Sequence, residues 1–157
     1  MELSAVSIES LIPVIRLQLE VGGRSNLVVT GHSMYPTLRN CRDIVELVPV
    51  RRDLHKGDLI LYQRRNGAYV LHRIITEPVE DEFNCAGDNQ WELELVQLRQ
   101  VIALVDTYIR GGKRIPVDSR CCRTWVRFWT WILPARRPIL KLLRTRARLH
   151  RWLRGNR

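Results

Sequence analysis

Apolar residues near the start of the chain recur at helical spacing. Three of them lie four positions apart: Leu11, Ile15 and Leu19. Two glycines follow at positions 22 and 23, where they act as a stop signal. We therefore expect an amphipathic helix over residues 4–20. Pro13 interrupts this pattern, and it either kinks the helix or marks its true first turn.

From residue 27 onward the pattern changes to short runs rich in β-branched residues, which are typical of strands. The predicted strands cover residues 27–30, 44–50, 59–62, 69–76 and 101–109. Glycine, asparagine and aspartate turn signals separate them, and the Asn66-Gly67 pair between two runs predicts a hairpin. We expect a mainly β domain that folds as a small barrel or coiled sheet.

Basic residues are concentrated at the C-terminal end. Residues 1–118 carry 14 Lys and Arg against 16 Asp and Glu, whereas residues 119–157 carry 12 basic residues and no acidic one. The high isoelectric point therefore reflects the tail and says little about the globular part. We divide the chain into a β domain with its N-terminal helix, residues 1–118, and a basic, Trp-rich tail, residues 119–157.

The tail is periodic in both its apolar and its basic residues. Four large apolar residues fall at helical spacing: Trp125, Phe128, Trp129 and Ile132. Basic residues then repeat every three or four positions: Lys141, Arg144, Arg148, Arg151 and Arg154. An amphipathic basic helix is typical of a segment that lies on an anionic membrane, so we favour a membrane surface or membrane protein as its partner. Docking to an acidic protein is the second choice, and nucleic acid or a plain solvated tail is the least favoured.

No hydrophobic run approaches the roughly 20 residues needed to span a bilayer. The N-terminus also lacks the basic start, apolar centre and small-residue cleavage site of a secretory signal. We therefore expect a cytoplasmic protein that can associate peripherally with a membrane. The four cysteines show no metal-ligand spacing, so the sequence predicts reduced thiols and neither a metal site nor a cofactor.

The segment GHSMYPTL, residues 31–38, follows the first predicted strand. Gly31 permits a sharp turn and Pro36 prevents a regular helix or central strand from continuing, so the turn can hold Ser33 at the lip of a strand. A serine nucleophile needs a base. Of the four histidines, His72 is the best placed, because it interrupts an apolar strand face. Taken alone, such a histidine is more often a core residue than a base.

Four sequence segments favour His72 as a catalytic base over a core histidine. GHSMYPTL, HKGDLILYQ, YVLHRII and CAGDNQ follow one another in the order and approximate spacing of the conserved boxes of type I signal peptidases. Residues 27–109 resemble the Ser-His branch of that family, found in the endoplasmic reticulum, archaea and some Gram-positive bacteria, because His72 stands where the bacterial branch has its lysine base. The resemblance implies that Ser33 is the nucleophile, that His72 is the general base and that Asp88 supports the histidine.

The resemblance also assigns supporting residues. Met34 and Pro36 would shape the turn and the substrate groove, and a second acidic residue would be Glu92 or, as the better match, Glu94. We expect an imidazole pKa near its ordinary value of 6.5, pushed upward by the Asp88 carboxylate. The chain has Gly31 where lysine-type members often have a hydroxyl residue, so the oxyanion would depend on backbone N–H groups.

These features predict a serine endopeptidase that cuts a leader or signal-like segment of a peptide or preprotein after small residues. The fold implied is the folded β-barrel shared by signal peptidases and self-cleaving repressors. Two alternatives remain open. One is a self-cleaving repressor, against which His72 and the lack of an N-terminal helix-turn-helix count. The other is a non-catalytic module whose basic tail binds membrane, protein or nucleic acid.

Overall fold

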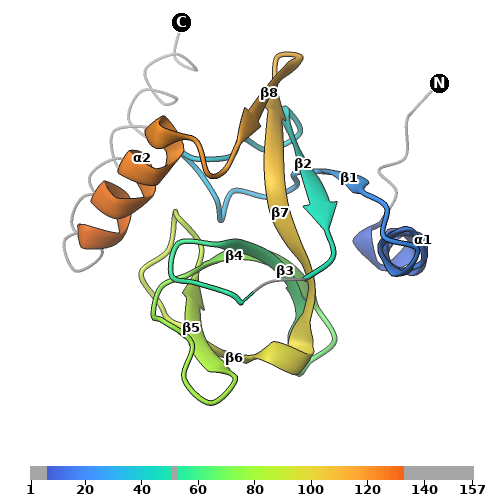
Figure 1. Ribbon diagram of the computed structural model, residues 1–157, viewed down its shortest axis with the longest axis horizontal. Coiled ribbons are helices and arrows are strands. Elements are labelled where there is room, and N and C mark those ends of the chain that lie inside the picture. Colours follow the sequence, from blue (N-terminus) through green and yellow to red (C-terminus); the bar gives the residue numbers. More distant parts are fainter. Residues whose placement is uncertain (1–6, 51–52, 133–157) are drawn as a thin grey trace, which may run out of the picture.

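The computed structural model describes residues 7–50 and 53–132 as a mainly β structure with two helices (Figure 1). The helices are α1 (Ile8–Glu20) and α2 (Arg120–Trp131), and a short 3-10 turn, η1 (Leu98–Gln100), precedes the longest strand. The strands are β1 (Ser25–Val28), β2 (Asp43–Val48), β3 (Leu59–Gln63), β4 (Tyr69–Ile74), β5 (Glu82–Ala86), β6 (Glu94–Gln97), β7 (Val101–Arg110) and β8 (Lys113–Pro116).

The eight strands form one antiparallel sheet. Its order is β1-β2-β7-β3-β4-β5-β6, and β8 pairs with β7. The β3–β4 hairpin predicted from Asn66 and Gly67 is confirmed, since Gln63 pairs with Tyr69 across a turn in which Gly67 has a φ of +87°. In Figure 1 the strands β3 to β6 coil around a central space. Within the described residues β1 and β6 each pair on one side only, so the sheet is not closed and a barrel is not confirmed.

Two apolar cores fill the structure. The first lies between α1 and the β1, β2 and β7 strands, and it includes Ile12, Ile15 and Leu19 from the helix. Pro13 lies inside α1, so it does not mark the first turn. The second core lies within the coil of β3 to β6, where Tyr62, Ile74 and other buried side chains meet. Strand alternation directs Tyr62 and His72 to the same face of the hairpin as Ile74.

Helix α2 packs on the β domain through two of its tryptophans. Trp129 is 7% exposed, and its Nε1–H donates to the Asp88 carbonyl over 3.0 Å. Trp125 stacks on Trp129 at a centroid distance of 5.1 Å and donates to the Thr37 hydroxyl over 2.9 Å. These two indoles therefore face the protein, and not a membrane or partner as the sequence indicated.

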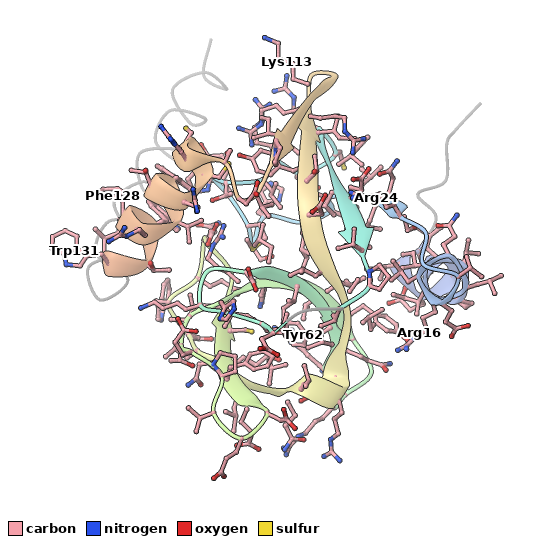
Figure 2. All side chains as sticks on the ribbon, viewed as in Figure 1. Arg16, Arg24, Tyr62, Lys113, Phe128 and Trp131 are labelled. Atoms are coloured by element: carbon pink, nitrogen blue, oxygen red, sulfur yellow. The ribbon has the colours of Figure 1, made fainter. Side chains whose placement is uncertain are left out.

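Two large apolar side chains on the outer side of α2 stay exposed. Figure 2 shows Phe128 and Trp131 on the side of α2 that points away from the sheet, and they are 49% and 78% exposed. The basic repeat predicted over residues 141–154 lies outside the described residues. Neither α1 nor α2 has the length and apolar character that a bilayer crossing requires.

Candidate active site around Ser33 and His72

Ser33 lies in the loop that connects β1 to β2. Met34 and Leu38, 2% and 0% exposed, anchor this loop in the first core. The Leu38 N–H donates to the Met34 carbonyl over 2.8 Å, and Gly31 makes its turn with a φ of +83°. Ser33 itself is only partly buried. The predicted presentation of Ser33 on a sharp turn is therefore observed, with the neighbouring side chains fixing the loop.

The loop around Ser33 is attached to the Gly87-Asp88-Asn89 segment that follows β5. The Asn89 backbone N–H donates to the Ser33 carbonyl over 2.7 Å, and its side-chain amide donates to the His32 carbonyl over 3.0 Å. A Cβ atom at position 87 would lie 2.6 Å from the Ser33 carbonyl oxygen. This contact is closer than real Cβ atoms allow, so only glycine permits the two loops to approach.

His72 lies on β4 beside the same segment. Arg73 pairs with Ala86 and Ile74 with Cys85, so continuation of this antiparallel register brings His72 alongside Gly87. The structure thus brings the backbones of Ser33, His72 and Asp88 together around Gly87. The imidazole is 2% exposed, and its Nδ1 lies 3.2 Å from the Tyr62 hydroxyl. Ser33 and His72, both in the described chain, share no hydrogen bond in this structure.

Burial and, after it, the Arg64 guanidinium lower the pKa of His72 to about 4. The Glu94 and Asp88 carboxylates act in the opposite direction but are outweighed. The expectation of a value pushed above 6.5 was therefore wrong, because it counted a nearby carboxylate and ignored desolvation. At neutral pH the imidazole is uncharged, which is the form that can accept a proton.

Asp88 has a different partner from the one that the sequence indicated. Its two carboxylate oxygens accept from Arg73 Nε and Nη2 over 2.9 and 2.7 Å, and both side chains are almost fully buried. Arg73 also donates to the Gly57 carbonyl over 2.8 Å. Adjacent residues of a strand point to opposite faces, so the carboxylate that binds Arg73 lies across the strand from the His72 ring. Asp88 acts on His72 through its field, without a hydrogen bond.

Glu94, on β6, is the acidic residue whose charge acts most strongly on His72. Arg64 binds its carboxylate with contacts of 2.8, 3.0 and 2.7 Å. Although burial alone would raise the pKa of Glu94, hydrogen bonds from Arg64 and then Tyr62 hold it below its usual value. Glu92, the other candidate, is exposed. Tyr62 and Arg64 were missed in the sequence, although the predicted hairpin already placed Tyr62 on the same strand face as His72.

The two residues expected to shape a substrate groove differ in exposure. Met34 is 2% exposed and belongs to the first core, so it anchors the loop and offers almost no surface to a substrate. Pro36 is partly buried, and its role toward substrate stays a prediction.

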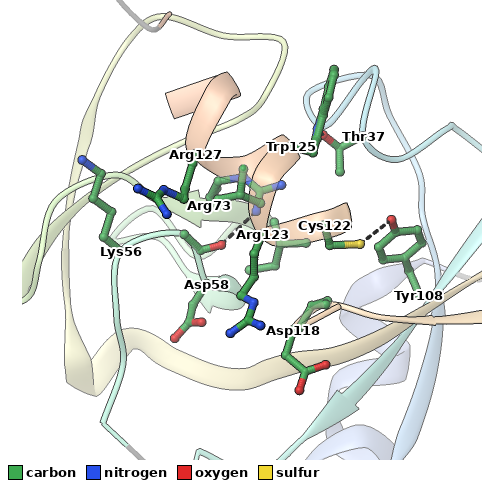
Figure 3. A pocket seen from close by; sticks show the side chains of 14 residues that line it. Thr37, Lys56, Asp58, Arg73, Tyr108, Asp118, Cys122, Arg123, Trp125 and Arg127 are labelled. Carbon is green, nitrogen blue, oxygen red and sulfur yellow. Dashed lines mark hydrogen bonds between the residues drawn. The ribbon is translucent and has the colours of Figure 1, made fainter. Parts of the chain in front are cut away.

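A separate cavity of about 270 Å³ lies beneath α2 (Figure 3). Arg73 reaches it from β4, while Arg123 and Arg127 reach it from α2. Neither Ser33, His72 nor Asp88 is among the residues that line it. The cavity is therefore separate from the candidate catalytic site.

A scan of the sequence against models of protein families finds none that matches, and a search of curated proteins finds no match either.

Proposed function

We propose that this chain is a serine endopeptidase that resembles type I signal peptidases and cleaves a leader or signal-like segment after small residues. The observation that carries the proposal is the attachment of the Ser33 loop to the Gly87–Asn89 segment, beside the strand that bears His72. In this proposal the Ser33 hydroxyl attacks the peptide carbonyl while neutral His72 takes its proton.

The backbone around Ser33 supports this chemistry. The Ser33 N–H forms no hydrogen bond with any described residue, so it is available to an oxyanion. The Gly31 N–H, by contrast, already donates to the Asn40 side chain over 2.9 Å. Catalytic hydrogen bonds are often formed only when substrate closes the site, so a Ser33–His72 bond would belong to the substrate complex.

Unpaired strand edges offer a place for an extended substrate. β1 pairs only with β2 among the described strands, and β4 pairs with β5 only at Arg73 and Ile74. The first half of β4, which leads to His72, therefore keeps its second edge unpaired. An extended peptide that paired with these edges would complete the sheet toward the folded barrel expected from the resemblance.

Cleavage of a peptide library by the purified full chain tests this proposal. Fragments should end after small residues, and Ser33→Ala should abolish their formation because the nucleophile is lost. Ser10→Ala, which removes an exposed serine of α1, is the matched control and should cleave normally. Equal cleavage by Ser33→Ala and the unmodified chain would contradict the proposal.

A non-catalytic module is the second candidate, favoured by the buried imidazole and by the missing Ser33–His72 hydrogen bond. In that case the full chain would cleave no member of the library. In both cases we propose that the basic tail associates with an anionic membrane surface or a membrane protein. Binding of the full chain to anionic vesicles that weakens with salt would support this.

A further inference from the structure

A chain of polar side chains leads from His72 through the second core to the edge of the sheet. His72 Nδ1 lies 3.2 Å from the Tyr62 hydroxyl. Burial raises the pKa of the Tyr62 hydroxyl, and the Glu94 carboxylate, held by Arg64, lies close enough to the phenol to raise it further. The four residues come from β4, β3, β6 and the turn after β3. Tyr62 is 0% exposed, so its hydroxyl depends on these protein partners.

Elementary chemistry favours one arrangement of the protons among these four side chains. Glu94 is ionised beside Arg64, and an ionised carboxylate can only accept hydrogen bonds. The Tyr62 hydroxyl has one proton, and a charged carboxylate attracts it more strongly than a neutral imidazole nitrogen does, so the hydroxyl directs its proton toward Glu94. Its oxygen then meets His72 as an acceptor, and Nδ1 must carry the proton of the neutral ring.

We propose that Tyr62, oriented by Glu94 and Arg64, is the positioning residue that holds His72 in its Nδ1–H tautomer and leaves Nε2 free to act as the base. The inference rests on the proposed function, since a base at Nε2 matters only if Ser33 is a nucleophile. In serine proteases a carboxylate accepts from the histidine directly. Here the neutral Tyr62 phenol stands between the Glu94 carboxylate and His72. The charge of Glu94 stabilises the imidazolium through that phenol.

Asp88 does not take this role, because its carboxylate binds Arg73 on the opposite face of β4 from the His72 ring. The opposite arrangement, in which the Tyr62 hydroxyl donates to Nδ1, would place the ring proton on Nε2. That tautomer could not accept a proton from Ser33 through Nε2. The tautomer of His72 therefore distinguishes a catalytic arrangement of this network from a merely structural one.

The test is ¹⁵N NMR of the histidine side chains in the folded full chain at neutral pH, together with steady-state cleavage of a library-derived peptide. We expect the Nδ1–H tautomer for His72 in the unmodified chain. Tyr62→Phe, which removes only the hydroxyl, should lose that preference. Its kcat should fall roughly tenfold or more, and by no more than the roughly 10²–10⁴-fold that a general base supplies, with little change in KM.

Tyr108→Phe is the matched control, because it removes another buried hydroxyl, which contacts Cys122 Sγ at 3.0 Å. It should leave both the His72 tautomer and kcat unchanged. An Nε2–H tautomer in the unmodified chain overturns the inference, as does a Tyr62→Phe variant that keeps the Nδ1–H tautomer and full kcat. An Nδ1–H tautomer that depends on Tyr62 in a chain without peptidase activity would support the positioning role and overturn the proposed function.

Discussion

His72 shows how the environment of a single residue decides its charge. Desolvation in the second core, together with the Arg64 charge, lowers its pKa to about 4, so the ring is neutral in the folded protein at pH 7. In the unfolded chain the same ring has a pKa near 6.5. Between these two values only the unfolded state binds the proton, and the folded state therefore loses stability as the pH falls.

We accordingly expect the free energy of unfolding to fall by about 3 kcal/mol, through this residue, as the pH drops from 6.5 to about 4. The measurement is urea unfolding from pH 4 to 8 for the unmodified chain and for His72→Phe, which cannot titrate. The difference between the two curves should change by this amount. Parallel curves for the unmodified chain and His72→Phe would refute the lowered pKa.

Asp88 is the buried counter-ion of Arg73. Asp88→Asn would leave a guanidinium that is only 2% exposed without its counter-charge. Loss of one partner of a buried pair typically destabilises a fold by roughly 3–5 kcal/mol. We therefore expect unfolding at much lower urea concentration for Asp88→Asn, and little change for Asp81→Asn at an exposed aspartate.

A double variant separates this effect from a loss of packing. Asp88→Leu combined with Arg73→Met removes both charges and should recover most of the stability lost in Asp88→Asn. If Asp88→Asn unfolds like the unmodified chain, the Arg73–Asp88 pair does not hold β4 to the segment that follows β5.

At the scale of elements, α2 holds the two loops of the candidate site. Its tryptophans bond the Thr37 hydroxyl, in the Ser33 loop, and the Asp88 carbonyl, after β5. A Cβ atom at Gly57 would lie 2.9 Å from a Val126 methyl group, so the helix also packs closely on the β2–β3 connection. The helix therefore belongs to the folded unit that positions Ser33.

Trp129→Ala should consequently lower the free energy of unfolding by roughly 3–5 kcal/mol, because it removes a buried indole and leaves a cavity. Trp131→Ala is the control on the same helix, since Trp131 is 78% exposed. Its effect should stay within about 0.5 kcal/mol. Urea unfolding of both variants checks this, and equal stabilities would show that α2 does not dock.

The elements differ in how far the sequence predicts them. The runs at residues 59–62 and 101–105 are continuous and apolar, because β3 and β7 are buried between neighbouring strands, and both strands were predicted. β5, β6 and β8 were missed, since β5 and β6 begin with glutamate and β8 carries Lys113 and Arg114. Short strands with polar residues give little periodicity, and their pairing is decided by the rest of the sheet.

For the whole molecule, the sequence located the candidate nucleophile and base but not their partners. Ser33 could be found because a turn motif is local in sequence. The Arg73–Asp88 and Arg64–Glu94 pairs join residues 15 and 30 positions apart, and only the fold decides which face each side chain occupies. The same applies to Trp129, whose helical spacing predicted an apolar face but could not say what covers it.

In the proposed function, Ser33 forms a covalent bond with its substrate while His72 removes the serine proton. Acid quenching of the full chain during turnover of an activated peptide ester, followed by mass spectrometry of its fragments, tests this most directly. We expect an acyl group on Ser33, absent in Ser33→Ala and much slower to form in His72→Gln. An acyl group on another residue, or acylation that Ser33→Ala and His72→Gln leave unchanged, would contradict it.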